Sequence, residues 1–318
     1  MKTKIILQEG VWSKLKRFYP ILLITISASL WGVIAIFVRK LSSVGFSSME
    51  IVTIRVTVAA ILLGILGAVK YRSQMKIQLM DIKLFIGTGI FSIVLFNWCY
   101  FTSVNQMNLS LAVILLYTSP AFVTILSFVF LKEKMSWLKG ISVTGTILGC
   151  ILIAGVSQTD TASISAIGII TGLGAGFGYA LYSIFGKFAL EKYQPFTVTF
   201  YTFLIAAITL IPLTHLWDKG NILFTGEVLL YGVGFGLFPT VIAFLLYTKG
   251  LEQIESSKAA IIATVEPVVA TLLSLFLYKE GFGVIQAIGS GLILASVIIV
   301  NLPIGPFAKK QKASISYD

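Results

Sequence analysis

Glu266 is the residue of this 318-residue sequence whose type and position most clearly permit chemistry. It lies ten residues into an apolar run that begins near Ser256, about 15 Å along a helix that rises about 1.5 Å per residue. At that depth of an apolar layer about 30 Å thick, a carboxylate is unfavourable by roughly 2.5–3.5 kcal/mol unless it is protonated or faces a polar cavity. We expect Glu266 to exchange a proton or bind an amine. The alternative is a protonated structural side chain that bonds to a neighbouring helix.

Two prolines interrupt apolar runs in which helices are expected. Pro267 directly follows Glu266, and Pro120 occupies the middle of an earlier run. Each proline removes one backbone hydrogen bond and frees the carbonyl group four residues earlier. Interrupted helices at matching positions indicate a binding site near the membrane midplane, the alternative being a simple packing kink. Ser119 and Tyr117, beside Pro120, would add hydroxyl groups to that pathway.

Arg55 is a basic residue about two turns inside an apolar run. Its side chain either extends to the water interface or binds a carboxylate of a substrate or of the protein. Other side chains could line a cavity and stack on an organic ligand, or else pack in the apolar interior. These are Trp31, Asn97, Trp98, Tyr100 and Tyr179.

Two further patterns concern helix packing and helix ends. Gly174 and Gly178 have the GxxxG spacing that lets one helix approach another closely. Glu133 and Glu280 each end an apolar run and precede the next expected helix, where a carboxylate suits the positive end of the helix dipole. We expect capping at both positions, with a gating role as the alternative.

The composition excludes most soluble classes of protein. Hydrophobic residues make up 57% of the chain and charged residues 12%, against about 25% charged in soluble domains, and the mean hydropathy is +0.95. Long continuous apolar runs predict an all-α integral membrane protein rather than a barrel. The sequence has neither a GxxxxGK[ST] phosphate loop nor a cluster with metal-ligand spacing. We therefore expect no cofactor, no metal and no enzymatic activity. An intramembrane enzyme and a non-transporting sensor are the minor alternatives.

Apolar runs near 20 residues predict ten transmembrane helices and leave only short connections. We expect a basic N-terminal tail over 1–17, helices 1–5 within 18–157, helices 6–10 within 158–303, and a C-terminal tail over 304–318. The predicted spans are 18–38, 48–69, 83–104, 109–131, 136–156, 164–186, 195–214, 227–248, 256–278 and 282–302.

The net charge of +11 reports orientation rather than nucleic-acid binding. Most Lys and Arg residues fall in the tails and in alternate connections, on one side of the membrane. By the positive-inside rule, both termini are expected in the cytoplasm. The short tails favour a multi-pass protein of the bacterial cell membrane.

Residues 87–133 align without a gap onto 234–280, and about fifteen of the 47 pairs are identical. Matched pairs include Pro120 with Pro267 and Glu133 with Glu280. Each repeat contains five helices, an odd number, so the second copy must be inverted relative to the first. Inverted repeats are the architecture of transporters that work by alternating access around a midplane site.

With the matched prolines and the glutamates thirteen residues after them, the sequence resembles the drug/metabolite transporter superfamily, EamA type, over about residues 20–302. This resemblance implies ten helices in two repeats and export of small metabolites, often amino acids or drugs. We expect a secondary transporter of a small amphipathic metabolite, exchanged for protons or moved alone. Uptake, or flipping of a sugar- or lipid-linked metabolite, is the alternative. The expected partners are the substrate and the lipid bilayer, with a monomer favoured over a dimer.

Overall fold

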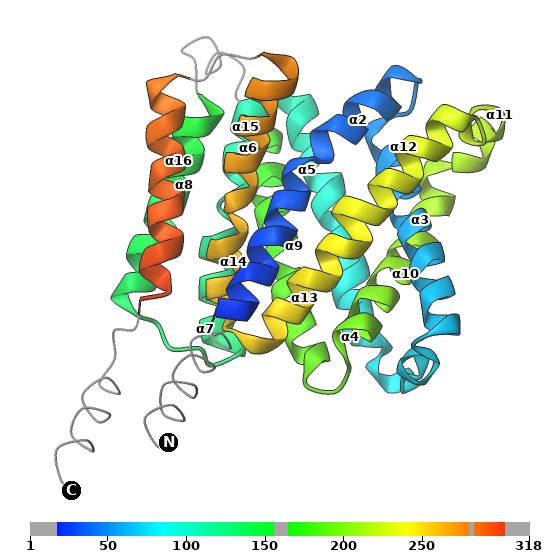
Figure 1. Ribbon diagram of the computed structural model, residues 1–318, viewed down its shortest axis with the longest axis horizontal. Coiled ribbons are helices and arrows are strands. Elements are labelled where there is room, and N and C mark those ends of the chain that lie inside the picture. The colour runs from blue at the N-terminus through cyan, green and yellow to red at the C-terminus, as the bar shows by residue number, and fades with distance from the viewer. Residues whose placement is uncertain (1–17, 156–164, 280–282, 303–318) are drawn as a thin grey trace, which may run out of the picture.

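The computed structural model describes residues 18–155, 165–279 and 283–302, and every regular element in these ranges is helical. Within these ranges, nine helices are long and apolar enough to cross a membrane, and the shorter apolar helix Val284–Val300 follows them. These ten helices cross the bundle alternately in opposite directions (Figure 1). We call the face at which the first helix begins and the tenth ends the terminal face, and the opposite one the loop face. The predicted fold class, a ten-helix membrane protein, is confirmed.

The helices follow the predicted spans closely, although the first reaches Ser43 and the eighth reaches Gln253, each five residues further than expected. The first span is Phe18–Ser43, and its outer part is α2 (Ile34–Ser43). The second span is α3 (Ser48–Val69), followed by the short turns η1 (Arg72–Met75) and η2 (Leu79–Asp81). The remaining elements are α4 (Ile82–Ile86), η3 (Gly87–Val94), α5 (Leu95–Gln106), α6 (Leu109–Leu116), α7 (Ser119–Phe130), α8 (Trp137–Ala154), α9 (Ala166–Leu190), α10 (Pro195–Thr214), η5 (Leu216–Lys219), α11 (Gly220–Leu223), α12 (Gly226–Gly236), η6 (Leu237–Ile242), α13 (Ala243–Gln253), α14 (Ser256–Ala263), α15 (Val265–Tyr278) and α16 (Val284–Val300).

The two repeats deviate from regular α-helix at matching places. The third span contains the wide π-helical segment η3, and the eighth contains its counterpart η6. The fourth span breaks between α6 and α7 at Tyr117 and Thr118, and the ninth breaks between α14 and α15 at Thr264. Both breaks lie two or three residues before the mid-helix prolines, as expected where a proline ring crowds the preceding turn. π-Segments and broken helices in membrane proteins accompany functional sites.

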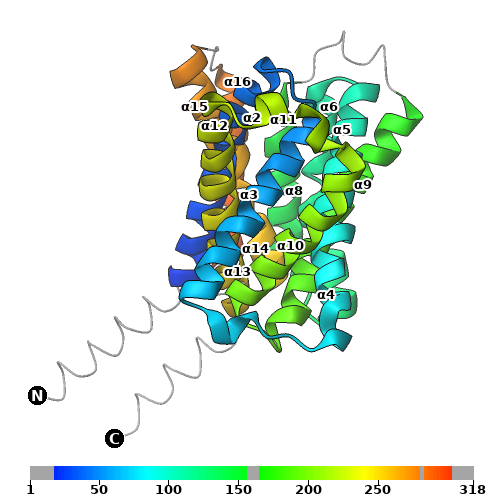
Figure 2. The ribbon, with the colours of Figure 1, turned by 90° about the vertical axis from the view of Figure 1, so that its right-hand side faces the viewer.

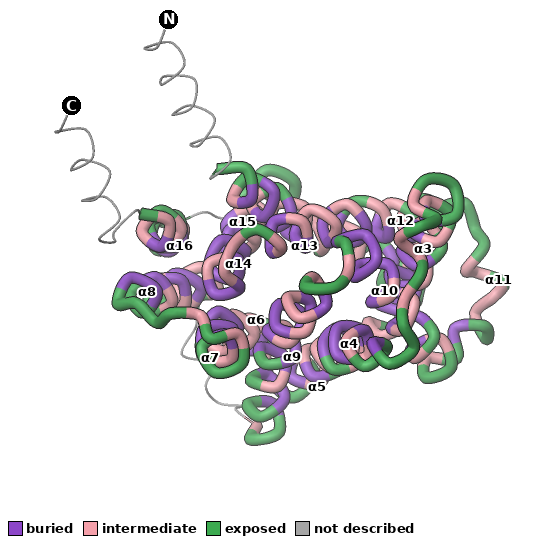
Figure 3. The backbone as a smooth tube through the Cα atoms, turned by 90° about the horizontal axis from the view of Figure 1, so that it is seen from below, coloured by how far each residue is buried: buried purple, intermediate pink, exposed green. Residues whose placement is uncertain are grey.

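Helices of the first repeat pack directly against helices of the second. Helix α5 of the first repeat packs along α9 of the second, α3 along α10, and α8 along α16. The α8–α16 pair stands at one end of the oblong bundle, and α3, α10 and α12 stand at the other (Figures 2 and 3). The central helices between these ends therefore enclose the interior in which a site can form.

The glycines Gly174 and Gly178 bring α9 close to α5. A Cβ atom at Gly178 would lie 3.0 Å from the backbone nitrogen of Phe96, and one at Gly174 would lie 3.0 Å from the sulfur of Cys99. The predicted close approach is therefore present. It joins two helices of this chain, so this face of α9 is covered by α5.

Candidate functional site

A cavity of about 160 Å³ lies inside the bundle between the two repeats. Its walls come from the first three helices and α6 on one side, and from α9, α12, α13 and α15 on the other. It extends from the middle of the bundle toward the loop face, where Val38 and Ile51 line it. Seven of the predicted site residues line this single cavity: Trp31, Arg55, Asn97, Tyr100, Tyr117, Tyr179 and Glu266.

Glu266 enters the cavity from the first turn of α15, directly after the break at Thr264. The side chain of Tyr117, at the corresponding break in the first repeat, faces its carboxyl group. The repeat alignment places Ser119 opposite Glu266, so only the second repeat carries an acid before its proline. The two helix breaks therefore bring an acid and a phenol together at the repeat interface.

Arg55 is only 5% exposed, so its side chain does not extend to the water interface. Its guanidinium lies 5.4 Å from the centre of the Phe235 ring and, in the part of the chain that is described, has no carboxylate within 4 Å. Glu266 attracts it from elsewhere on the cavity wall without direct contact. The cavity thus presents one basic and one acidic group on its walls that do not form an ion pair with each other.

Aromatic rings form the floor of the cavity. The indole of Trp31 packs against Tyr179, Phe244 and Tyr247 at centroid distances of 6.2, 5.1 and 5.2 Å. Trp31, Phe96, Tyr179 and Phe244 also line a smaller void of about 30 Å³ beneath the main cavity. These rings therefore separate the two spaces.

Hydroxyl pairs on the wall of the smaller void close the bundle toward the terminal face. Tyr182 bonds to Thr248 at 2.7 Å, and Ser183 bonds to Tyr247 at 2.8 Å. One turn further along α9, the Lys187 ammonium donates to the carbonyl groups of Leu251 and Ile254, each at 2.7 Å. The sequence did not single out the Tyr, Ser and Thr residues of these pairs, because an isolated Tyr, Ser or Thr in an apolar helix carries no positional signal.

Four predicted pathway residues lie outside the cavity. Trp98 is 54% exposed on the outer surface, so its predicted place in the cavity is wrong. Ser119, Pro120 and Pro267 are buried at the helix breaks, beside the cavity lining rather than within it. The residues that complete the lining, such as Phe96, Phe235 and Phe244, are apolar and had no signal in the sequence.

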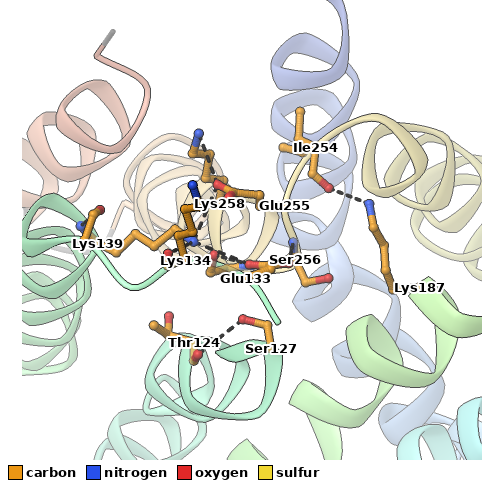
Figure 4. Close-up of polar contacts among 12 residues, drawn as sticks. Thr124, Ser127, Glu133, Lys134, Lys139, Lys187, Ile254, Glu255, Ser256 and Lys258 are labelled. Atoms are coloured by element: carbon orange, nitrogen blue, oxygen red, sulfur yellow. Dashed lines mark hydrogen bonds and ion pairs between the residues drawn. The ribbon is translucent and has the colours of Figure 1, made fainter. Parts of the chain in front are cut away.

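Glu133 caps a different helix from the one predicted. Its carboxylate accepts hydrogen bonds from the backbone N–H groups of Ser256 and Ser257, at 2.5 and 3.2 Å, and from the Ser257 hydroxyl at 2.5 Å. These groups begin α14 of the second repeat, whereas the following helix, α8, is capped by Ser136. Figure 4 shows this contact beside Lys139, whose ammonium lies 3.5 Å from Glu133. Glu280, its counterpart, lies outside the described residues.

Replacing Glu133 with glutamine should destabilise the protein by about 1–3 kcal/mol, because an amide accepts fewer of these bonds and removes the charge at the helix N-terminus. Burial opposes ionisation, but the bonds from Ser257 and the two backbone N–H groups outweigh it and hold the pKa of Glu133 below its usual value. The stabilisation by the Glu133 carboxylate is therefore complete above the pKa of glutamate in the unfolded chain, near 4.3. It is lost as the pH falls through the lower pKa of Glu133 in the folded protein.

Thermal unfolding of the purified wild type and of Glu133→Gln at several pH values would measure this loss of stability. The matched control is Glu252→Gln, which breaks the partly exposed Lys249 pair and should change stability by less than about 0.5 kcal/mol. Equal effects of the two substitutions near neutral pH would contradict the capping role.

Comparisons with known proteins agree with this architecture. The family model described as the EamA-like transporter family matches residues 18–155 and again 166–302. A protein of Archaeoglobus fulgidus described as an uncharacterized transporter is 27% identical over 293 residues, 91% of this chain and 98% of the relative. The uncharacterized transporter YxxF of Bacillus subtilis is 26% identical, over 84% of each chain. A solved structure titled only as a crystal structure of a protein superposes with a TM-score of 0.73 at 18% identity, over 88% of this chain and 96% of the other, which shows a shared fold.

Proposed function

This chain belongs to the EamA-like transporter family, and from that premise we propose that it is a secondary transporter that exports a small amphipathic metabolite, such as an amino acid. The observation that carries the proposal is the central cavity at the interface of two inverted repeats, lined by Arg55, Glu266 and aromatic rings. In inverted-repeat transporters the substrate site lies near the midplane, where one repeat rocks against the other.

The size and charge of the cavity indicate the kind of substrate. Its volume of about 160 Å³ is well below the roughly 300–1,000 Å³ of pockets that hold drug-sized ligands. One basic and one acidic side chain on its walls suit a molecule that carries both charges, and the surrounding rings suit an apolar body. These features support a small zwitterion over a multi-ring drug or a sugar-linked compound.

The way in which the cavity is closed supports alternating access. It is lined toward the loop face by Val38 and Ile51, while the Tyr182–Thr248 and Ser183–Tyr247 pairs separate it from a vestibule of about 690 Å³ at the terminal face. Rocking of one repeat would break these pairs and open the site to the vestibule. The breaks in the fourth and ninth helices supply places for bending.

The membrane orientation rests on the distribution of basic side chains. Lys132, Lys134, Lys187 and Lys258 lie at helix ends or loops on the terminal face, whereas Arg39, Lys40 and Lys219 lie toward the loop face. The excess at the terminal face supports a cytoplasmic location for that face and for both termini, in a bacterial cell membrane. In this orientation the vestibule opens to the cytoplasm.

Flux into proteoliposomes tests the proposal. Vesicles that contain the purified full chain and a pH-sensitive dye would receive a pH gradient and then pools of amino acids and other small metabolites. One pool should move protons across the membrane in protein-containing vesicles and not in protein-free vesicles. The absence of both substrate uptake and proton movement for every pool would overturn the transporter assignment.

A further inference from the structure

Two residues that line the central cavity each carry a hydrogen-bond donor that has no partner in the described protein. Six buried side-chain polar atoms lack a hydrogen bond in the described ranges: Trp31 Nε1, Arg55 Nε, Thr57 Oγ1, Asn108 Nδ2, Ser142 Oγ and Ser256 Oγ. Trp31 and Arg55 are the two residues among these that line the central cavity. Because buried polar groups are nearly always satisfied in native proteins, these two donors are places where an acceptor from outside the chain would pair.

Neighbouring rings hold both donors in place. The Trp31 indole is packed by three aromatic rings, and it is 5% exposed. The Arg55 guanidinium lies over the ring of Phe235. These ring contacts restrict both side chains, so their unpaired N–H groups stay at the cavity wall, covered by protein atoms, and a ligand would need to displace only those atoms to pair with them.

The chemistry of these donors defines the group that they bind. An indole N–H and a guanidinium N–H donate only, and the guanidinium keeps its positive charge. The ligand must therefore bring acceptors and negative charge, and the two oxygens of a carboxylate match two separate donors. Glu266 also lines the cavity but does not lie within 4 Å of Arg55, so no carboxylate of the described protein pairs with the guanidinium.

We propose that the central cavity recognises the carboxylate of its substrate through Arg55 Nε and Trp31 Nε1. In this arrangement Trp31 contributes a hydrogen bond to the substrate carboxylate, which sets the specificity for acids, in addition to the packing surface of its ring. The inference rests on the proposed transport function and adds a requirement to it: acids are bound, and their amides are rejected because an amide lacks the charge.

Binding of matched acid and amide pairs to the purified full chain in lipid nanodiscs tests the requirement. The probes are leucine with leucinamide, phenylalanine with phenylalaninamide, and isovalerate with isovaleramide, and the readout is the ligand-induced rise in melting temperature. At least one acid should stabilise the wild type, and its amide should not. Trp31→Phe keeps an aromatic ring, although a smaller one, and removes the N–H, and should weaken binding of that acid by roughly tenfold.

Trp98→Phe is the matched control, because Trp98 lies on the outer surface, and it should bind the acid as the wild type does. Without ligand, Trp31→Phe should melt below the wild type, since the smaller ring leaves a gap among the packed aromatic rings, so each variant's ligand-induced rise is measured from its own melting temperature. If Trp31→Phe does not fold, Arg55→Lys provides the second test, because lysine keeps the charge but lacks the planar donor group. It should also weaken binding of the acid.

Three outcomes would overturn the proposal: amides that bind as well as their acids, a Trp31→Phe protein that binds as Trp98→Phe does, or failure of every acid to bind. The flux assay separates this from the transport function. Flux of a substrate that has no carboxylate would support the transport function and contradict the carboxylate requirement. Binding of an acid without any flux would support the carboxylate requirement and contradict the transport function.

Discussion

Replacement of Glu266 by glutamine should abolish proton movement driven by substrate in proteoliposomes, to the level of protein-free vesicles. Glutamine has nearly the same shape but cannot take up or release a proton. Glu266 is the acidic residue that lines the central cavity, and the Tyr117 side chain faces it. If the carboxylate also binds the substrate amine, affinity should fall by roughly tenfold or more, the typical effect of losing a charge-assisted hydrogen bond.

Flux of the identified substrate, measured across a range of pH with the dye and with radiolabel, distinguishes these roles. The matched control is Ser119→Ala, at the position that the repeat alignment pairs with Glu266, where the side chain is buried outside the cavity. It should keep the wild-type pH dependence. Unchanged pH dependence in Glu266→Gln would remove the coupling role. Loss of proton movement with retained exchange of labelled for unlabelled substrate would support it.

Replacement of Gly178 by alanine should destabilise the protein by about 1–3 kcal/mol, although alanine favours helices over glycine by about 1 kcal/mol. The added methyl group would meet the backbone of Phe96 at 3.0–3.1 Å, and backbone atoms cannot move aside as a flexible side chain can. Relief requires α9 to move away from α5. Because Tyr179, the next residue, lines the cavity, substrate binding should weaken in the same variant.

Melting temperature and the elution profile of the purified protein would measure the loss. The matched control is Gly291→Ala in α16, where a Cβ atom has no neighbour within 4 Å, so the gain in helix propensity should leave stability unchanged or raised. A Gly178→Ala protein as stable as Gly291→Ala would show that the α5–α9 contact tolerates a wider spacing.

Much of the candidate site could be predicted, because charged and proline residues are conspicuous in an apolar sequence. Glu266 and Arg55 were found by their position in apolar runs, and Tyr117 by its place beside Pro120. Trp98 was misplaced, whereas its neighbour Asn97 lines the cavity and donates to the carbonyl of Ile93. Adjacent residues of a helix point about 100° apart, so Asn97 and Trp98 do not both point toward the cavity.

By itself, the sequence determined the membrane class, the ten helices, the inverted repeat and the position of Glu266 midway along an apolar span, since each depends on the order of apolar and polar residues along the chain. Only the tertiary structure decided which face of each helix meets the cavity. Lipid and protein interior are both apolar, so hydropathy has no period that separates them. Contacts between repeats were equally hidden: Glu133 caps α14, a helix more than one hundred residues away in the sequence, because the inverted packing brings those ends together.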